Sequence, residues 1–294
     1  MFGIPFQALA LQMFMGFTLG SIFILMAIGF SLIFGMLTIV NFAHGAFYTW
    51  GAFLILFIVG NIGSFWIGLI LVPILVGVMG LIIERTLIRR LYGLSIDYPL
   101  LLTFGLSMIM TEIIRVIWGF GDHPFNIPHL LQDPINLGLF FFPSYWLFVI
   151  AITWFILFVL WILLKKTELG LIIRAGSRDS IMVRTLGINI SKIWLLVFGI
   201  GTSLAGLAGL LAAPMRSVYP EMGLGMLIEC FVVVVVGGMG SLKGAICSGI
   251  LMGLVVSLTT LIYPAMSNIT IYIAMAVVLL VRPSGLFGER GLLE

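Results

Sequence analysis

Charged residues are scarce in this sequence of 294 residues. Asp, Glu, Lys and Arg together make up 9% of the chain, and none of them occurs among the first 83 residues. A soluble domain usually carries about 25% charged residues. Because 62% of the residues are hydrophobic, the chain lacks the polar surface that a globular protein turns to water. We therefore expect a membrane protein surrounded by a lipid bilayer, with no nucleic-acid partner.

Motifs that would support catalysis or cofactor binding are also missing. The two cysteines, Cys230 and Cys247, lie in apolar stretches and show neither a disulfide framework nor a metal-ligand spacing. No G-x-x-x-x-G-K-[ST] motif for binding ATP is present. No Ser/His/Asp set or carboxylate pair stands at catalytic spacing. We therefore expect no enzyme activity, no metal site and no cofactor bound by this chain; if ATP drives it, a partner subunit hydrolyses the ATP.

Long apolar runs dominate what is present, and a spanning helix needs about 20 such residues. The N-terminus has no basic region, so residues 1–28 are typical of a first span and not of a cleaved signal peptide. The predicted fold class is all-α: a polytopic helical membrane protein with about 8–9 membrane segments, some discontinuous, in one domain over residues 1–294. The expected segments are 8–28, 34–58 (interrupted at 41–45), 65–83, 98–117, 144–164, 193–213, 226–240, 244–263 and 269–282.

The basic residues predict the orientation, because Lys and Arg concentrate in short cytoplasmic loops. Residues 85–97 hold three, residues 165–192 hold six and the tail after residue 281 holds two, which is eleven of fourteen. We therefore place these two loops and the C-terminus in the cytoplasm, and the loop 118–143 outside. The N-terminus is outside if the first 83 residues make three spans, and inside if one of them is re-entrant.

The first interruption lies in Gly29–Phe53, GFSLIFGMLTIVNFAHGAFYTWGAF. A simple anchor has no need of Asn41, His44 or Gly45 here. A helix broken within the membrane, with polar side chains turned to a water-filled path, needs them. Three positions apart, Asn41 and His44 share one face if the segment is helical. The alternative is that both only hydrogen-bond to neighbouring helices and hold the fold.

Four glycines in eight positions predict a second interruption at residues 237–244, GGMGSLKG. The ends of a broken helix suit the carboxylate and the ammonium group of an amino acid. Glu229 stands upstream, where a carboxylate either meets an ammonium group at the outer mouth of a span or sits at the interface. The candidate pathway residues are Asn41, His44, Gly45, Glu229, Gly237, Gly238, Gly240 and Ser241. For the glycines at 199, 201, 206 and 209 we expect close helix packing instead.

The loop 165–192 is the most polar segment of the chain. Ser177 or Asp179 can cap a short helix there, and Gly187 can end it. Met182, Val183 and Leu186 then fall on one side of that helix at helical spacing. A short amphipathic helix in the cytoplasm favours docking in a groove of a partner. The alternative is an ordinary positive loop that happens to be helical.

Three blocks of the sequence resemble a known family. They are the Asn-Phe-Ala-His-Gly block at 41–45, the Arg-Ala…Asp…Leu-Gly-Ile loop at 174–188 and the Gly-Gly-Met-Gly-Ser block at 237–241. With the surrounding residues they resemble the permease subunits of branched-chain amino acid ABC transporters, more closely the H-type than the M-type. The resemblance extends from the first span to the RPSGLFGE tail.

The resemblance implies a multi-pass protein of the bacterial inner membrane that imports leucine, isoleucine or valine by alternating access. It implies a second permease (M-type or a copy of this chain), two cytoplasmic ATPases and a periplasmic substrate-binding protein as partners. The ATPase-coupling residues would be Arg174, Arg178, Asp179, Met182, Val183, Leu186 and Gly187.

Alternatives stay open at this point. Permeases for urea, short amides and other amino acids are similar to this family. An ion-coupled secondary transporter would need a carboxylate in mid-span, whereas Glu84, Glu112 and Glu229 lie toward the ends of the predicted spans. For Glu112 and Arg115, three residues apart, we expect a local ion pair near the outer surface, with a role as a gate as the alternative. A purely structural membrane subunit would leave the two interruptions unexplained.

Overall fold

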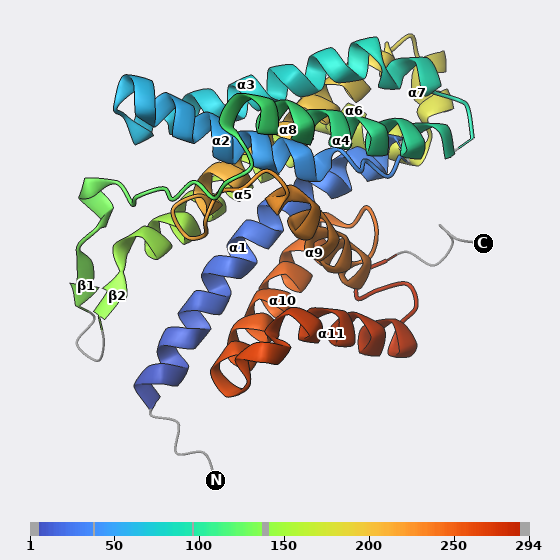
Figure 1. Cartoon of the computed structure of the whole chain (residues 1–294). Helices are drawn as coiled ribbons and strands as arrows, with labels where there is room; N and C mark the ends of the chain where they lie inside the picture. The colour runs from blue at the N-terminus through green and yellow to red at the C-terminus, as the bar shows by residue number, and fades with distance from the viewer. Residues whose placement is uncertain (1–5, 38, 96, 137–140, 289–294) are drawn as a thin grey trace. The chain divides into compact units, whose positions relative to one another are not determined.

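The computed structural model describes residues 6–37, 39–95, 97–136 and 141–288 (Figure 1). Its contacts divide the chain into two compact units, each assembled from separate stretches of sequence. Unit 1 comprises Met1–Ala27, Asn126–Phe155 and Glu229–Glu294, and unit 2 comprises Ile28–Phe125 and Ile156–Ile228. The single permease domain over residues 1–294 stays a prediction.

Within the described residues, eight helical stretches are long and apolar enough to cross a membrane, and α9 (Met222–Gly237) is a shorter apolar helix. The predicted all-α membrane fold with 8–9 segments is therefore confirmed. The eight are α1 (Phe6–Leu37), α2 (His44–Ile62), α3 (Phe65–Thr86) with the short helix η1 (Ile88–Leu91), α4 (Asp97–Trp118), α5 (Ser144–Lys166), α8 (Ile190–Ala212), α10 (Leu242–Ile262), and α11 (Ser267–Val281) with η3 (Pro264–Met266).

Helix α1 is longer than the sequence predicts. It continues through Gly29 and Gly35 to Leu37, so the expected boundary between a first span ending at 28 and a second beginning at 34 is wrong. Gly29 is needed for packing rather than for a break. A Cβ there would lie 2.6 Å from the carbonyl oxygen of Gly201 in α8, so only glycine allows the two helices to approach this closely.

In unit 2, helix α8 packs along both α2 and α3, which also contact each other (Figure 1). Glycines allow the close approach, as expected for the sixth predicted span. A Cβ on Gly209 would overlap the carbonyl of Tyr48, and one on Gly206 would lie 2.7 Å from Val76. The Ser203 hydroxyl also donates to the carbonyl of Pro73, at 2.7 Å. These contacts confirm close packing for this glycine set.

In unit 1, the first part of α1 packs against α10 through glycines of both helices. A Cβ on Gly20 would lie 2.9 Å from the Gly249 carbonyl oxygen. The pair is also joined by two reciprocal hydrogen bonds. Gln12 Nε2 donates to the carbonyl of Ser257 at 2.6 Å, and Ser257 Oγ donates to the carbonyl of Gln12 at 2.7 Å. Helix α11 packs on α10.

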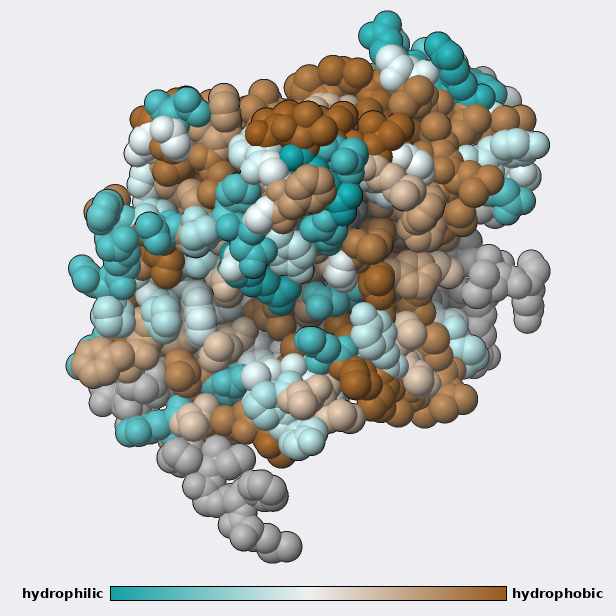
Figure 2. Space-filling model, in the orientation of Figure 1, coloured by the Kyte–Doolittle hydropathy of each residue, from teal (hydrophilic) through white to brown (hydrophobic). Residues whose placement is uncertain are grey.

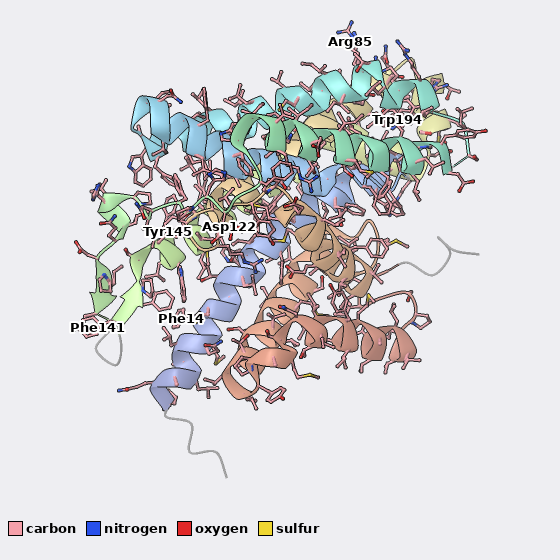
Figure 3. All side chains as sticks on the ribbon, in the orientation of Figure 1. Phe14, Arg85, Asp122, Phe141, Tyr145 and Trp194 are labelled. Atoms are coloured by element: carbon pink, nitrogen blue, oxygen red, sulfur yellow. The ribbon has the colours of Figure 1, made fainter. Side chains whose placement is uncertain are left out.

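The loop between α4 and α5 contains structure that the sequence analysis missed. Strands β1 (Pro134–Asn136) and β2 (Phe141–Pro143) pair antiparallel, with Ile135 opposite Phe142. The short helix η2 (His129–Leu131) precedes them. The centre of the Phe142 ring lies 4.8 Å from that of Phe14 in α1, which is labelled in Figure 3, and this end of the hairpin is buried in unit 1.

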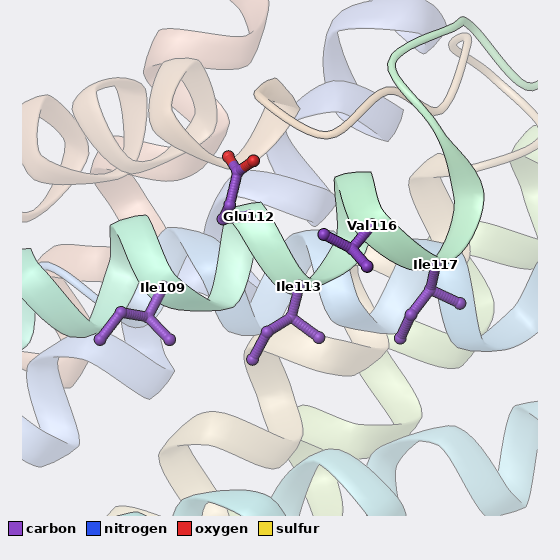
Figure 4. A pocket seen from close by; sticks show the side chains of 5 residues that line it. All are labelled: Ile109, Glu112, Ile113, Val116 and Ile117. Atoms are coloured by element: carbon purple, nitrogen blue, oxygen red, sulfur yellow. The ribbon is translucent and has the colours of Figure 1, made fainter.

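Hydrophobic residues cover large areas of the face seen in Figure 2, where they are brown, beside areas of polar residues in teal. Many large hydrophobic side chains of α3, α4 and α5 are exposed, including Ile70, Leu101 and Phe158. Figure 4 shows an apolar stretch on α4, where Ile109, Ile113, Val116 and Ile117 line one pocket together with Glu112. Such a surface is suited to lipid and not to water.

Candidate functional site

The first interruption is a turn between two helices and not a break inside one span. Residues 39–43 are non-helical, and α2 begins at His44. The prediction that Asn41 and His44 share a helix face is therefore wrong. Asn41 is fully buried; its Oδ1 accepts from the Ala43 N–H at 3.1 Å, and its carbonyl accepts from the His44 N–H at 3.2 Å. Local Asn-to-backbone bonds of this kind favour a turn over a helix.

Thr103 of α4 completes this turn, and the sequence analysis did not identify it. Its Oγ1 accepts from the Phe42 N–H at 3.1 Å and lies within donating distance of the Val40 carbonyl, at 3.4 Å, and of the Leu100 carbonyl, at 3.1 Å. Among the described residues, Asn41 Nδ2 has no acceptor. Hydrogen bonds to Asn41 and Thr103 therefore stabilise the turn, and the Asn41 Nδ2 group is a buried donor that they do not use.

His44 and Gly45 open α2 in a closely packed region. The His44 ring is fully buried and lies edge-on to Phe30, with 5.7 Å between ring centres. A Cβ on Gly45 would overlap the carbonyl of Gly223 at the start of α9. These contacts account for both residues by packing, and their place on a substrate path stays a prediction.

The second interruption is confirmed as a break between helices α9 and α10. Gly238 and Gly240 have φ values of 100° and 79°, which favour glycine, and Ser241 Oγ caps α10 by accepting from the Gly244 N–H at 3.1 Å. Gly237 ends α9 against α10, since a Cβ there would lie 2.6 Å from the carbonyl carbon of Gly244.

The C-terminal tail covers the end of α9, which the sequence analysis did not foresee. The Leu286 N–H donates to the carbonyl of Val236 at 2.8 Å, and the Phe287 N–H donates to that of Gly237 at 3.0 Å. Two carbonyls that were expected to suit an ammonium group are therefore already paired. Glu229 lies seven residues inside α9 and not at the mouth of a span, because the helix begins earlier than expected, at Met222.

The segment between α5 and α8 forms two short helices, α6 (Glu168–Arg178) and α7 (Ser180–Thr185). The caps are as predicted for α7. Asp179 Oδ1 accepts from the Met182 N–H at 2.8 Å, and Gly187 has a φ of 82° just beyond the helix. Arg174 and Arg178 are exposed on α6.

The expected apolar side of α7 is wrong at one position. Met182 and Leu186 are 63% and 72% exposed, but Val183 is only 4% exposed. Val183 therefore packs inward, and Ile181, 75% exposed, joins the outward apolar set. The sequence spacing could not separate the two sides, because both are apolar.

A buried cluster of Glu84, Arg89 and Tyr92 lies at the end of α3, and the sequence analysis did not identify it as a site. Glu84 has no exposed side-chain surface. Its carboxylate accepts from Arg89 Nε at 3.3 Å, from Arg89 Nη2 at 3.0 Å and from the Tyr92 hydroxyl at 2.5 Å. Burial, and next the hydrogen bond to Glu84, raise the pKa of Tyr92 well above its ordinary value, so Tyr92 acts as a neutral donor. The sequence offered one signal for this site, since Glu84 is the first charged residue after 83 residues without charge.

The cluster borders a cavity of about 380 Å³ within unit 2. Tyr92, Trp194, the end of α1 at Met36, and Gly176 and Ser180 of the α6–α7 segment line it. The Tyr92 ring meets the Trp194 ring edge-on at 4.7 Å. Trp194 is labelled in Figure 3, on α8.

Arg115 forms the ion pair predicted at the end of α4, and a second one. Its guanidinium lies 2.8 Å from Glu112 and also pairs with Glu221, which precedes α9, with Nε 2.9 Å from Oε1. All three side chains are partly exposed. An exposed pair of this kind adds little stability.

Comparison with known proteins now identifies the family. The family model described as "Branched-chain amino acid transport system / permease component" matches residues 12–280. The chain belongs to this family. A permease protein of the high-affinity branched-chain amino acid transport system, LivH of Salmonella typhimurium, is 28% identical over 95% of both chains. Its counterpart BraD of Pseudomonas aeruginosa is 29% identical over 95% of both chains.

A more distant relative is the ribose import permease protein RbsC of Haemophilus influenzae, 26% identical over 62% of this chain and 57% of its own. The protein is thus a multi-pass membrane permease subunit of an ABC importer, as the sequence resemblance indicated. A permease of such a system works with further subunits.

Proposed function

We propose that the permease carries branched-chain amino acids (leucine, isoleucine and valine) across the bacterial inner membrane as the H-type subunit of an ATP-driven importer. The observation that carries this proposal is the family match over residues 12–280, which includes both helix interruptions and the α6–α7 segment. In this proposal the chain catalyses no reaction and binds no cofactor, and ATP is hydrolysed by partner subunits.

The proposed partners are a second permease (M-type or a copy of this chain), two cytoplasmic ATPases and a periplasmic substrate-binding protein. The basic loops 85–97 and 165–192 and the C-terminus face the cytoplasm. Three helices, α1, α2 and α3, come before the loop that follows Thr86, which supports an outside N-terminus.

The proposed mechanism is alternating access. The ATPases dock on the α6–α7 segment, where Met182, Leu186 and Ile181 offer exposed apolar contacts between exposed arginines. ATP binding and hydrolysis then move this segment, and the movement opens and closes the path beside the two interruptions. Those two regions differ from ordinary spans because turns, and not continuous helix, connect their helices.

Uptake by the complete importer in proteoliposomes tests the proposal. We expect ATP-dependent accumulation of labelled leucine that unlabelled isoleucine and valine compete for, and that urea and ribose do not. Accumulation of urea, a short amide or another amino acid instead would assign the permease to a related importer. Uptake by this chain without any ATPase would contradict the ATP-driven mechanism.

A further inference from the structure

Among the described residues of the permease, Glu84 is a charged residue with a fully buried side chain. Burying a carboxylate costs free energy unless donors compensate for the lost water. Glu84 receives three such hydrogen bonds, two from the Arg89 guanidinium and one from the Tyr92 hydroxyl. An apolar side chain would fill the space without this requirement. The cluster therefore calls for an explanation other than packing.

The cluster joins α3 to the first turn of α8. Arg89 Nη2 also donates to the carbonyl of Ser191, at 3.3 Å. One turn further along α8, the Trp194 ring rests on the ring of Tyr92. Glu84 thus holds, through two different residues, the beginning of a helix that lies more than a hundred positions away in the sequence.

The same turn of α8 receives the α6–α7 segment. Ile190, the first residue of α8, is buried against α6, where a Cβ on Gly176 would lie 2.9 Å from Ile190 Cδ1. Helix α7 leads into α8 through Gly187 and the cap Asn189, whose Oδ1 accepts from the Lys192 N–H at 3.3 Å. A displacement of α6–α7 therefore reaches Ile190 and Ser191 first.

A guanidinium that binds a carboxylate through two nitrogens permits one relative orientation, whereas apolar contacts permit sliding. We infer that Glu84, Arg89 and Tyr92 are positioning residues that make α3 follow the α6–α7 segment when the ATPases move it. The cavity of about 380 Å³ beside Tyr92 and Trp194 would otherwise give the α6–α7 segment room to move without moving α3. This inference rests on the proposed importer function.

The test measures ATP hydrolysis and leucine uptake in the same proteoliposomes, with the complete importer. The variants are Glu84→Gln, which removes the charge, and Tyr92→Phe, which removes one hydroxyl and keeps the ring contact. Arg89→Lys keeps the charge and loses the two-pronged geometry. Glu112→Gln is the matched control, because its carboxylate also pairs with an arginine but is exposed.

We expect Glu84→Gln to assemble with the ATPases and hydrolyse ATP, while uptake per ATP falls about tenfold, the effect of losing one charge-assisted hydrogen bond. Tyr92→Phe and Arg89→Lys should fall between this variant and the wild type, and Glu112→Gln should match the wild type. An unchanged uptake per ATP in Glu84→Gln and Tyr92→Phe would overturn the inference.

A parallel loss of uptake, hydrolysis and assembled complex in Tyr92→Phe would also overturn it, since that result would show a structural role only. The wild-type arm separates the two proposals. A wild-type importer without ATP-dependent uptake refutes the proposed function, and the inference that rests on it, whereas normal wild-type uptake with normal variants refutes the inference alone.

Discussion

Tyr92 shows how one hydroxyl can make stability depend on pH. Burial and the neighbouring Glu84 raise its pKa above the ordinary value of 10.0. The folded state therefore keeps the proton when the unfolded state loses it, and stability present below about pH 10 is lost as the pH rises further. We expect the unfolding temperature of the wild type to fall more steeply from pH 9 to 11 than that of Tyr92→Phe. Parallel curves for the two proteins would contradict the assignment.

Thr103 allows a similar test at the first interruption. Thr103→Val keeps the shape of the side chain but leaves the Phe42 N–H without its acceptor, which should cost ~1–3 kcal/mol of stability. Thermal unfolding in detergent measures this loss. Thr153→Val is the matched control, because the Thr153 hydroxyl is buried and has no partner among the described residues. Equal effects of the two substitutions would argue against the role of Thr103.

Substitutions at exposed and at buried positions of α7 should affect ATPase docking and folding, respectively. We expect Met182→Asp combined with Leu186→Asp to insert and fold normally but to lose ATPase association, because both side chains are exposed. Val183→Asp alone should instead reduce the amount of folded permease, since Val183 is buried. Co-purification of the ATPases and recovery from size-exclusion chromatography distinguish these results. Normal co-purification of the double variant would contradict docking at this face.

Two substitutions at Leu286, in the tail that covers the end of α9, should differ in their effect on stability. Leu286→Pro removes the N–H that pairs with the Val236 carbonyl, whereas Leu286→Ala keeps it. We expect the proline variant to be less stable than the alanine variant by ~1 kcal/mol or more. Thermal unfolding of the two variants in the same detergent checks this. Equal stability would mean that the tail contributes no hydrogen bond to the end of α9.

Cysteine labelling in membrane vesicles tests the orientation of the whole chain in the membrane. In a variant without Cys230 and Cys247, a cysteine at the exposed position Thr185 should react with a membrane-impermeant maleimide only in inside-out vesicles. A cysteine at Asp122, exposed in the loop after α4 and labelled in Figure 3, should react only from the outside. The reverse pattern would overturn the orientation inferred from the basic loops.

The helix inventory followed from sequence because burial in lipid depends on the length and composition of a continuous segment. The boundary after α1 did not follow, because Gly29 is as consistent with a break as with close packing. The residue that Gly29 packs against, Gly201 of α8, lies far along the chain. Only the position of Gly201 in the fold shows that Gly29 allows two helices to cross closely. The same holds for Gly45, which packs on Gly223.

The sequence by itself determined the membrane class, the cap at Asp179, and the break after Gly237, since each depends on composition or on residues a few positions apart. Only the tertiary structure decided which side of α7 is buried, what covers the end of α9, and what holds Glu84. Those outcomes depend on partners such as Ser191 and Leu286, which lie tens of residues or more away and which local spacing does not specify.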